Sequence, residues 1–161
     1  MSAYYEFQLP SKILSGDEAL EHIPHELEGL GARRPLLLSD EGLERAGMVK
    51  TVLAALAQGG LTPAEVFCRI PPDSSIGVVN DIAGRYRAAG CDSLIAVGGG
   101  SVIDTAKGVG MVLAQAGEDL LSQSGCEVLP RGEHVPFVAV PTTAGTGSEA
   151  TIVAVVANPA E

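Results

Sequence analysis

Two short apolar runs are each followed at once by a glycine-rich segment, and this pairing constrains the fold more than any other feature. Residues 93–97 precede segment 98–101 (GGGS), and residues 137–140 precede segment 141–149 (PTTAGTGSE). A short apolar run bounded by turn residues is typical of a buried parallel strand. A glycine turn between a strand and a helix lets the backbone approach a phosphate, whose charge the helix dipole favours. The sequence therefore predicts a parallel sheet that holds the pyrophosphate of a nucleotide.

The rest of the chain alternates between short apolar runs and amphipathic stretches. Further strands are expected at 35–39 and, more weakly, at 65–68, with helices at 48–56, from 76 to Gly90, and at 101–114. Strands that alternate with helices of this length give right-handed crossovers and a parallel sheet. We therefore predict a Rossmann-like α/β fold, with helices flanking the sheet, in a single domain over residues 1–161.

Both ends of the chain carry further strand signals. Tyr4–Leu9 alternates roughly and, with Ile13-Leu14, predicts an N-terminal β-hairpin. Ser15 and Glu18 match a capping box, so a helix is expected from Ser15 that Pro24 kinks or breaks.

The C-terminal end predicts one more strand, over the β-branched run 151–156, followed by a turn at 158–161. A chain that stops at a turn directly after a strand is expected of a domain cut from a longer protein.

Composition excludes several classes of partner. The net charge is −10, which argues against nucleic acid and anionic membranes, because both require a basic surface. No apolar run approaches about 18 residues, so no membrane span or secretory leader is indicated. The three cysteines form no CxxC pair and predict reduced thiols in a cytoplasmic protein.

Three acidic residues follow predicted strands or open predicted helices. Asp40 ends the first long apolar run and would accept hydrogen bonds from the adenosine ribose while repelling a 2′-phosphate; it could instead cap the next element. Asp73 either faces the adenosine end or caps a turn. Asp104 either satisfies amides at its helix start or points at the site, and Lys107 on the same helix face suggests a surface ion pair with it.

Hydroxyl groups are concentrated in the second glycine-rich segment. Such a loop of small residues can enclose a nicotinamide ribose without crowding it, although a solvated surface loop has the same composition. The predicted cofactor-binding residues are Asp40, Asp73, Gly98, Gly99, Gly100, Ser101, Asp104, Thr142, Thr143, Thr146 and Ser148.

The histidines support neither a catalytic nor a metal assignment. His22 and His25 are three residues apart, a spacing that can bind a metal, but they lie among glutamates and are more typical of a solvated helix face. His134 is expected on the surface. We therefore assign no catalytic residue and no metal ligand to this chain.

The motif GGGSxxDxAK, followed about forty residues later by PTTAGTGSE, resembles the iron-containing (group III) alcohol dehydrogenases over essentially the whole chain. The resemblance implies the family's N-terminal NAD-binding domain, with Gly99, Gly100 and Ser101 on the pyrophosphate. It also implies that Thr142 and its neighbours line the nicotinamide side. NAD is implied rather than NADP, because of Asp40.

The family's second, helical domain, which holds Fe²⁺ or Zn²⁺ through one Asp and three His, has no counterpart in this sequence. The resemblance therefore implies half of an enzyme that oxidises a small alcohol to an aldehyde or ketone by hydride transfer, and a chain inactive by itself. A homodimer that pairs through the N-terminal strand is left open. Two alternatives also stay open: a lyase similar to dehydroquinate synthase, and a nucleotide-binding module without chemistry.

Overall fold

A computed structural model describes residues 11–115, 119–123, 132–151 and 153–158. A sheet of four parallel strands forms its centre: β1 (Pro35–Leu38), β2 (Glu65–Phe67), β3 (Ser93–Gly98) and β4 (Phe137–Pro141). The strand order is β2-β1-β3-β4. The chain thus moves outward from β1 to β2 and then crosses to the other side of β1. The direction of winding reverses between β1 and β3, and in such sheets ligands bind at the carboxyl ends beside this point.

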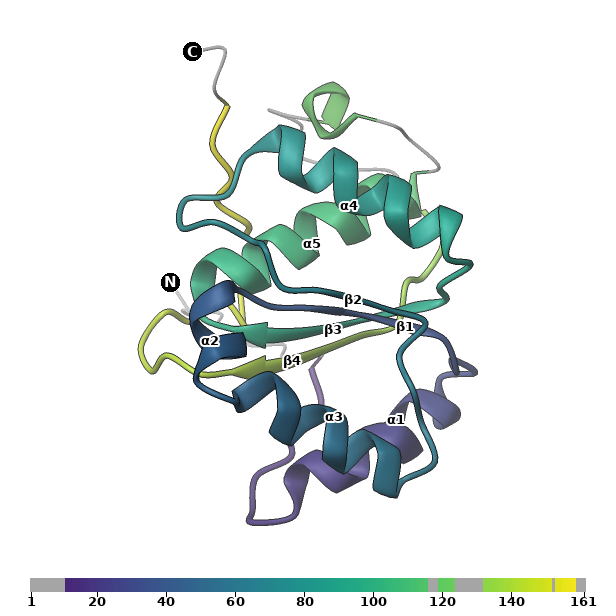
Figure 1. The fold of residues 1–161 in the computed structure, drawn as a ribbon. Coiled ribbons are helices and arrows are strands. Elements are labelled where there is room, and N and C mark those ends of the chain that lie inside the picture. The colour runs from purple at the N-terminus through teal and green to yellow at the C-terminus, as the bar shows by residue number, and fades with distance from the viewer. Residues whose placement is uncertain (1–10, 116–118, 124–131, 152, 159–161) are drawn as a thin grey trace, which may run out of the picture.

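Helices cover both faces of the sheet (Figure 1). On one face lie α4 (Ile76–Ala88) and α5 (Gly100–Ala114), and on the other α1 (Ile23–Gly29) and α3 (Met48–Gln58). The short helix α2 (Glu41–Arg45) lies at the carboxyl ends of the strands. Two 3₁₀ turns complete the described elements, Ala19–His22 and Leu120–Gln123. The predicted Rossmann-like α/β fold is confirmed.

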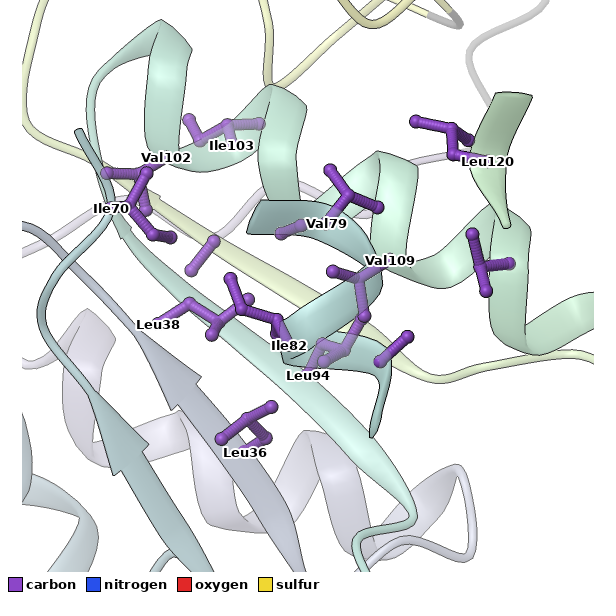
Figure 2. Close-up of a cluster of buried hydrophobic side chains, with 14 residues drawn as sticks. Leu36, Leu38, Ile70, Val79, Ile82, Leu94, Val102, Ile103, Val109 and Leu120 are labelled. Carbon is purple, nitrogen blue, oxygen red and sulfur yellow. The ribbon is translucent and has the colours of Figure 1, made fainter. Parts of the chain in front are cut away.

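Alternation along the strands divides the buried side chains into two cores. Leu36 and Leu94 face α4 and α5, and Figure 2 shows Ile82 of α4 and Val109 of α5 beside Leu94. The intervening residue Leu37 and its neighbour on β3 face α1 and α3. Both faces of β1 and β3 are thus buried, which is why these strands read as continuous apolar runs rather than as alternating ones.

The structure of the N-terminal region differs from the prediction. Tyr4–Leu9, the first strand of the predicted hairpin, lies outside the described residues, and Ile13-Leu14 is not part of a strand. The predicted cap at Ser15 is wrong: the 3₁₀ turn begins at Ala19 with no side-chain cap. The α-helix starts only at Ile23, with Pro24 in its first turn, where a missing amide costs no helical hydrogen bond. Pro24 therefore lies at the start of the α-helix, directly after the 3₁₀ turn, and interrupts no α-helix.

The predicted strand at 151–156 is also wrong for the residues described there. Segment 153–158 joins the fold through one isolated parallel bridge between Ser75 and Ala157. The amide of Ile76 donates to the carbonyl of Ala157 at 3.0 Å, and the amide of Ala157 donates to the carbonyl of Ser74 at 2.8 Å. The β-branched residues favour an extended chain, but no sheet edge accompanies them for long enough to form a ladder.

Candidate nucleotide-binding site

The glycine turn after β3 leads directly into α5. Gly98 ends the strand, Gly99 is the N-cap in an extended conformation, and Gly100 begins the helix. Within the described part of the chain, no side chain caps this helix. The amides of its first turn therefore stay available, and the positive end of the helix dipole reinforces them. This arrangement is suited to holding an anion.

The loop after β4 lies directly on this glycine turn. The amide of Thr142 donates to the carbonyl of Gly98 at 3.0 Å. A methyl group added to Gly99 would lie 2.8 Å from Oγ1 of Thr143, and one added to Gly100 would lie 3.3 Å from Oγ of Ser148. The glycines are thus needed for the close approach of this loop, a role that the sequence interpretation, based on phosphate access alone, did not include.

An open pocket of about 790 Å³ lies at the carboxyl ends of the strands. Four segments line this strand-end pocket: Asp40 and α2 after β1, residues 69–72 after β2, the turn 99–102 after β3, and Thr142-Thr143 after β4. The volume falls within the range of small-molecule and cofactor sites, about 300–1,000 Å³. Segments far apart in the sequence therefore meet where the winding reverses.

Asp40 has the capping role that the sequence left open, and its predicted contact with the ribose stays a prediction. Its Oδ1 accepts a hydrogen bond from the amide of Leu43 at 2.9 Å, so the carboxylate caps α2. Asp40 also lines the strand-end pocket. One carboxylate oxygen thus holds the helix start, and no hydrogen bond within the described residues is recorded for the other.

Asp73 has a left-handed backbone with φ of +53°, which is rare for a residue other than glycine. Its amide donates to Oγ of Ser101 at 3.4 Å. Ser101 lines the strand-end pocket, whereas Asp73 lies beyond the lining residues. Asp73 therefore holds the turn after Pro72 against the start of α5.

Asp104 and Lys107 face the C-terminal segment instead of the strand-end pocket. Oδ2 of Asp104 accepts from the amide of Val155 at 3.1 Å, and the Lys107 ammonium lies 3.6 Å from Oδ1. Lys107 also donates to the carbonyl of Val153 at 2.8 Å and to the hydroxyl of Thr151 at 3.1 Å. The side chains of Asp104 and Lys107 are only 11% and 15% exposed, so the surface ion pair that the sequence suggested is in fact largely buried.

Thr146 and Ser148 shape the loop from within. The hydroxyl of Thr146 accepts from the amide of Ser148 at 3.3 Å. Ser148 is buried, whereas Thr142, Thr143 and Thr146 are exposed. The loop is therefore solvated along most of its length but anchored over the glycine turn.

Sequence reasoning missed three charged residues that line the pocket: Glu41, Arg45 and Arg69. Arg69 lies two residues after the end of β2. Its position directly after the predicted strand 65–68 was the available signal.

Cys68, next to Arg69, is not available as a nucleophile or metal ligand. Burial raises the pKa of its thiol to about 11, and the Glu44 carboxylate adds to the effect. Among the described residues, no group of three or more His, Cys, Asp and Glu side chains could hold a metal ion. The described residues therefore do not fit a metal centre.

The fold and the pocket define a Rossmann-like α/β protein with an uncapped glycine turn where the winding of the sheet reverses. The model of the iron-containing alcohol dehydrogenase family matches residues 10–161, so the chain belongs to that family. In the described ranges, no helix has the length and apolar character that crossing a membrane requires.

Similar proteins of known identity include the choline dehydrogenase of Bacillus subtilis, at 33% identity over 98% of this chain and 39% of that protein. The 4-hydroxybutyrate dehydrogenase of Cupriavidus necator is 41% identical over 81% of this chain and 34% of that protein. The sulfoacetaldehyde reductase of Bifidobacterium kashiwanohense, solved in complex with NAD⁺, superposes with a TM-score of 0.86 at 25% identity, over 98% of this chain and 41% of that one. The chain thus spans about two fifths of the length of such relatives.

Proposed function

We propose that this chain is the NAD-binding part of a metal-dependent alcohol dehydrogenase. The observation that carries the proposal is the uncapped glycine turn at the reversal of the sheet, opening onto a pocket large enough for a nucleotide. Membership of the iron-containing alcohol dehydrogenase family supports the same conclusion.

In this proposal each lining segment binds one part of the dinucleotide. The amides of Gly99, Gly100 and Ser101 hold the pyrophosphate, for which the acidic chain offers backbone dipoles more than cations. The second oxygen of Asp40 accepts from the adenosine ribose, and Thr142-Thr143 flank the nicotinamide ribose. The cofactor itself supplies the hydride-accepting carbon.

The remaining predicted residues have supporting positions. Asp73, Asp104, Thr146 and Ser148 contact the glycine turn, the C-terminal segment or the loop, and do not line the strand-end pocket. We propose that they fix the shape of the site, while their direct contact with the cofactor stays a prediction.

The described residues contain no cluster of metal-ligand side chains. The alcohol and the metal are therefore proposed to bind outside the part of the protein that the structure describes. We therefore expect the 161-residue chain to bind NAD weakly and to show no alcohol-dependent NAD reduction. Calorimetry with NAD and NADP tests the first expectation. An activity assay with added Fe²⁺ and, separately, Zn²⁺ tests the second, and turnover by this chain alone would contradict the assignment.

The alternatives differ in what they predict. A lyase similar to dehydroquinate synthase would also bind NAD, but the family match favours a dehydrogenase. A binding module without chemistry would bind NAD tightly as the isolated chain. Cytoplasmic location and a homodimer remain expectations; the free thiols of Cys68 and Cys91 fit the former.

A further inference from the structure

Two basic residues line the strand-end pocket, and only one of them has a partner among the described residues. Arg45 is paired with Glu41 at 3.2 Å. Arg69 is exposed, and no ion pair or hydrogen bond to a described residue is recorded for it. A guanidinium that lines a pocket without an internal partner is available to a ligand.

The order of the strands indicates which part of a ligand Arg69 meets. Along the carboxyl edge, β2, β1 and β3 are followed by Arg69, Asp40 and the glycine turn, in that order. A dinucleotide with its pyrophosphate on the glycine turn and its ribose on Asp40 extends in the same direction to its adenine. The adenine therefore reaches the end of β2.

The backbone around Arg69 is fixed beside β1. The amide of Ser39 donates to the carbonyl of Phe67 at 2.9 Å, and the amide of Ile70 donates to the carbonyl of Ser39 at 3.3 Å. Cys68 and Ile70 are buried on either side of the exposed Arg69. The Arg69 side chain is thus attached to backbone that hydrogen bonds hold in place. Pro71-Pro72, which also lines the pocket, lies next to it.

We propose that the guanidinium of Arg69 stacks on the adenine ring of the bound dinucleotide, an inference that rests on the proposed NAD-binding function. Guanidinium groups are planar and weakly hydrated, and they stack on aromatic faces more readily than ammonium groups do. Arg69 is accordingly an affinity determinant for the adenosine half, while the glycine turn holds the phosphates.

Calorimetric titration of the 161-residue chain with NAD, AMP and NADP tests this assignment. Arg69→Gln should weaken NAD and AMP by the same factor, about three- to tenfold. Arg69→Lys keeps the charge but loses the planar group, and should recover less than half of that loss on a logarithmic scale. Lys50→Gln is the matched control: Lys50 is equally exposed and unpaired among the described residues but lies outside the pocket lining, so affinity should not change.

Three results would overturn the assignment of Arg69. The first is an unchanged affinity of Arg69→Gln for NAD and AMP. The second is full recovery of the affinity in Arg69→Lys, which would indicate that charge alone matters. The third is a larger loss of affinity for NADP than for NAD in Arg69→Gln, which would indicate a contact with the 2′-phosphate. A wild-type chain that binds AMP but not NAD would contradict the proposed function and leave the adenine contact intact. A wild-type chain that binds neither would overturn both.

Discussion

The two edges of the sheet use their polar groups in opposite ways. At the amino edge, the carboxylate of Asp92 accepts hydrogen bonds from the amides of Arg33 and Arg34, each at 2.8 Å. The Arg34 guanidinium donates to the carbonyls of Gly90 and Ala89, also at 2.8 Å. The polar groups of this edge therefore bind one another and close the ends of β1 and β3.

At the carboxyl edge, the corresponding groups, backbone amides and a guanidinium, have no internal partner among the described residues. The start of α5 has no side-chain cap among the described residues, and Arg69 has no recorded internal bond there. The contrast indicates that stability and binding are separated along the strands: the amino edge holds the sheet together, and the carboxyl edge is open to a ligand.

The pKa of Asp92 reflects this internal bonding. Burial by itself would raise the pKa, but the hydrogen bonds from the amides of Arg33 and Arg34 and from the hydroxyl of Ser93 together outweigh it and lower the pKa. The charged form of Asp92 is thus the one that the fold stabilises.

The largest expected effect comes from opening the closed edge. Asp92→Ala removes the acceptor of several hydrogen bonds and should lower the free energy of unfolding by about 2 kcal/mol, reduced from the sum of the bonds because the site is partly solvated. Urea denaturation measures this loss. NAD affinity of the folded variant should be unchanged, and a parallel loss of affinity would show that the two edges are not separate.

A methyl group at the open edge should have the next largest effect. Gly99→Ala should weaken NAD binding about tenfold, or about 1.4 kcal/mol, because the new Cβ lies 2.8 Å from Oγ1 of Thr143 and must displace the loop. Calorimetry measures the change.

The Thr143→Ala background identifies the cause. There the closest atom is gone, and Gly99→Ala should cost less than half as much on a logarithmic scale. An equal loss in both backgrounds would mean that the methyl group excludes the ligand itself and leaves the loop in place.

Asp40→Ser separates the two roles of that residue. Serine is also a good N-cap, so α2 should persist, while removal of the carboxylate should weaken NAD and shift the NAD/NADP affinity ratio several-fold toward NADP. A charge placed beside a solvated phosphate is worth about 1 kcal/mol. An unchanged ratio, with far-UV circular dichroism confirming the fold, would remove Asp40 from the ribose site.

The smallest effect is the acid dependence of the closed edge. Because the folded pKa of Asp92 is lowered, its stabilisation is complete above the ordinary carboxyl pKa of about 3.9 and is lost as the pH falls through the folded value. The urea midpoint of the wild type should therefore fall more steeply below pH 4 than that of Asp92→Asn. Parallel curves would contradict this role.

The sheet could be predicted from the sequence because both faces of β1 and β3 are buried. Continuous apolar runs such as Leu36-Leu37-Leu38 have few alternatives to a central strand. The C-terminal segment could not be predicted, since the 151–156 run has the composition of a strand but, among the described residues, its segment pairs only through the single bridge at Ala157. Local propensity does not determine pairing.

The site divides in the same way. Glycine turns can be recognised in the sequence because their composition is unusual. Gly99, Gly100 and Ser101, which the sequence singled out, do line the pocket. The place of Arg69 in the pocket and the burial of the Asp104–Lys107 pair depend on which segments meet in space. The partners of Asp104 and Lys107 are about fifty residues away, and no spacing rule indicates them.

The hydrogen bonds of the largely buried Lys107 lower the entropy cost of ordering the loop after β4 when a ligand binds. The loop after β4 is held at its start by the bond from Thr142 to Gly98 and beyond its end by the bonds from Lys107 to Thr151 and Val153. Its chain entropy is therefore partly lost on folding, before any ligand arrives. A nucleotide that enters the pocket meets a preorganised wall, so less of its interaction free energy is consumed in fixing that loop.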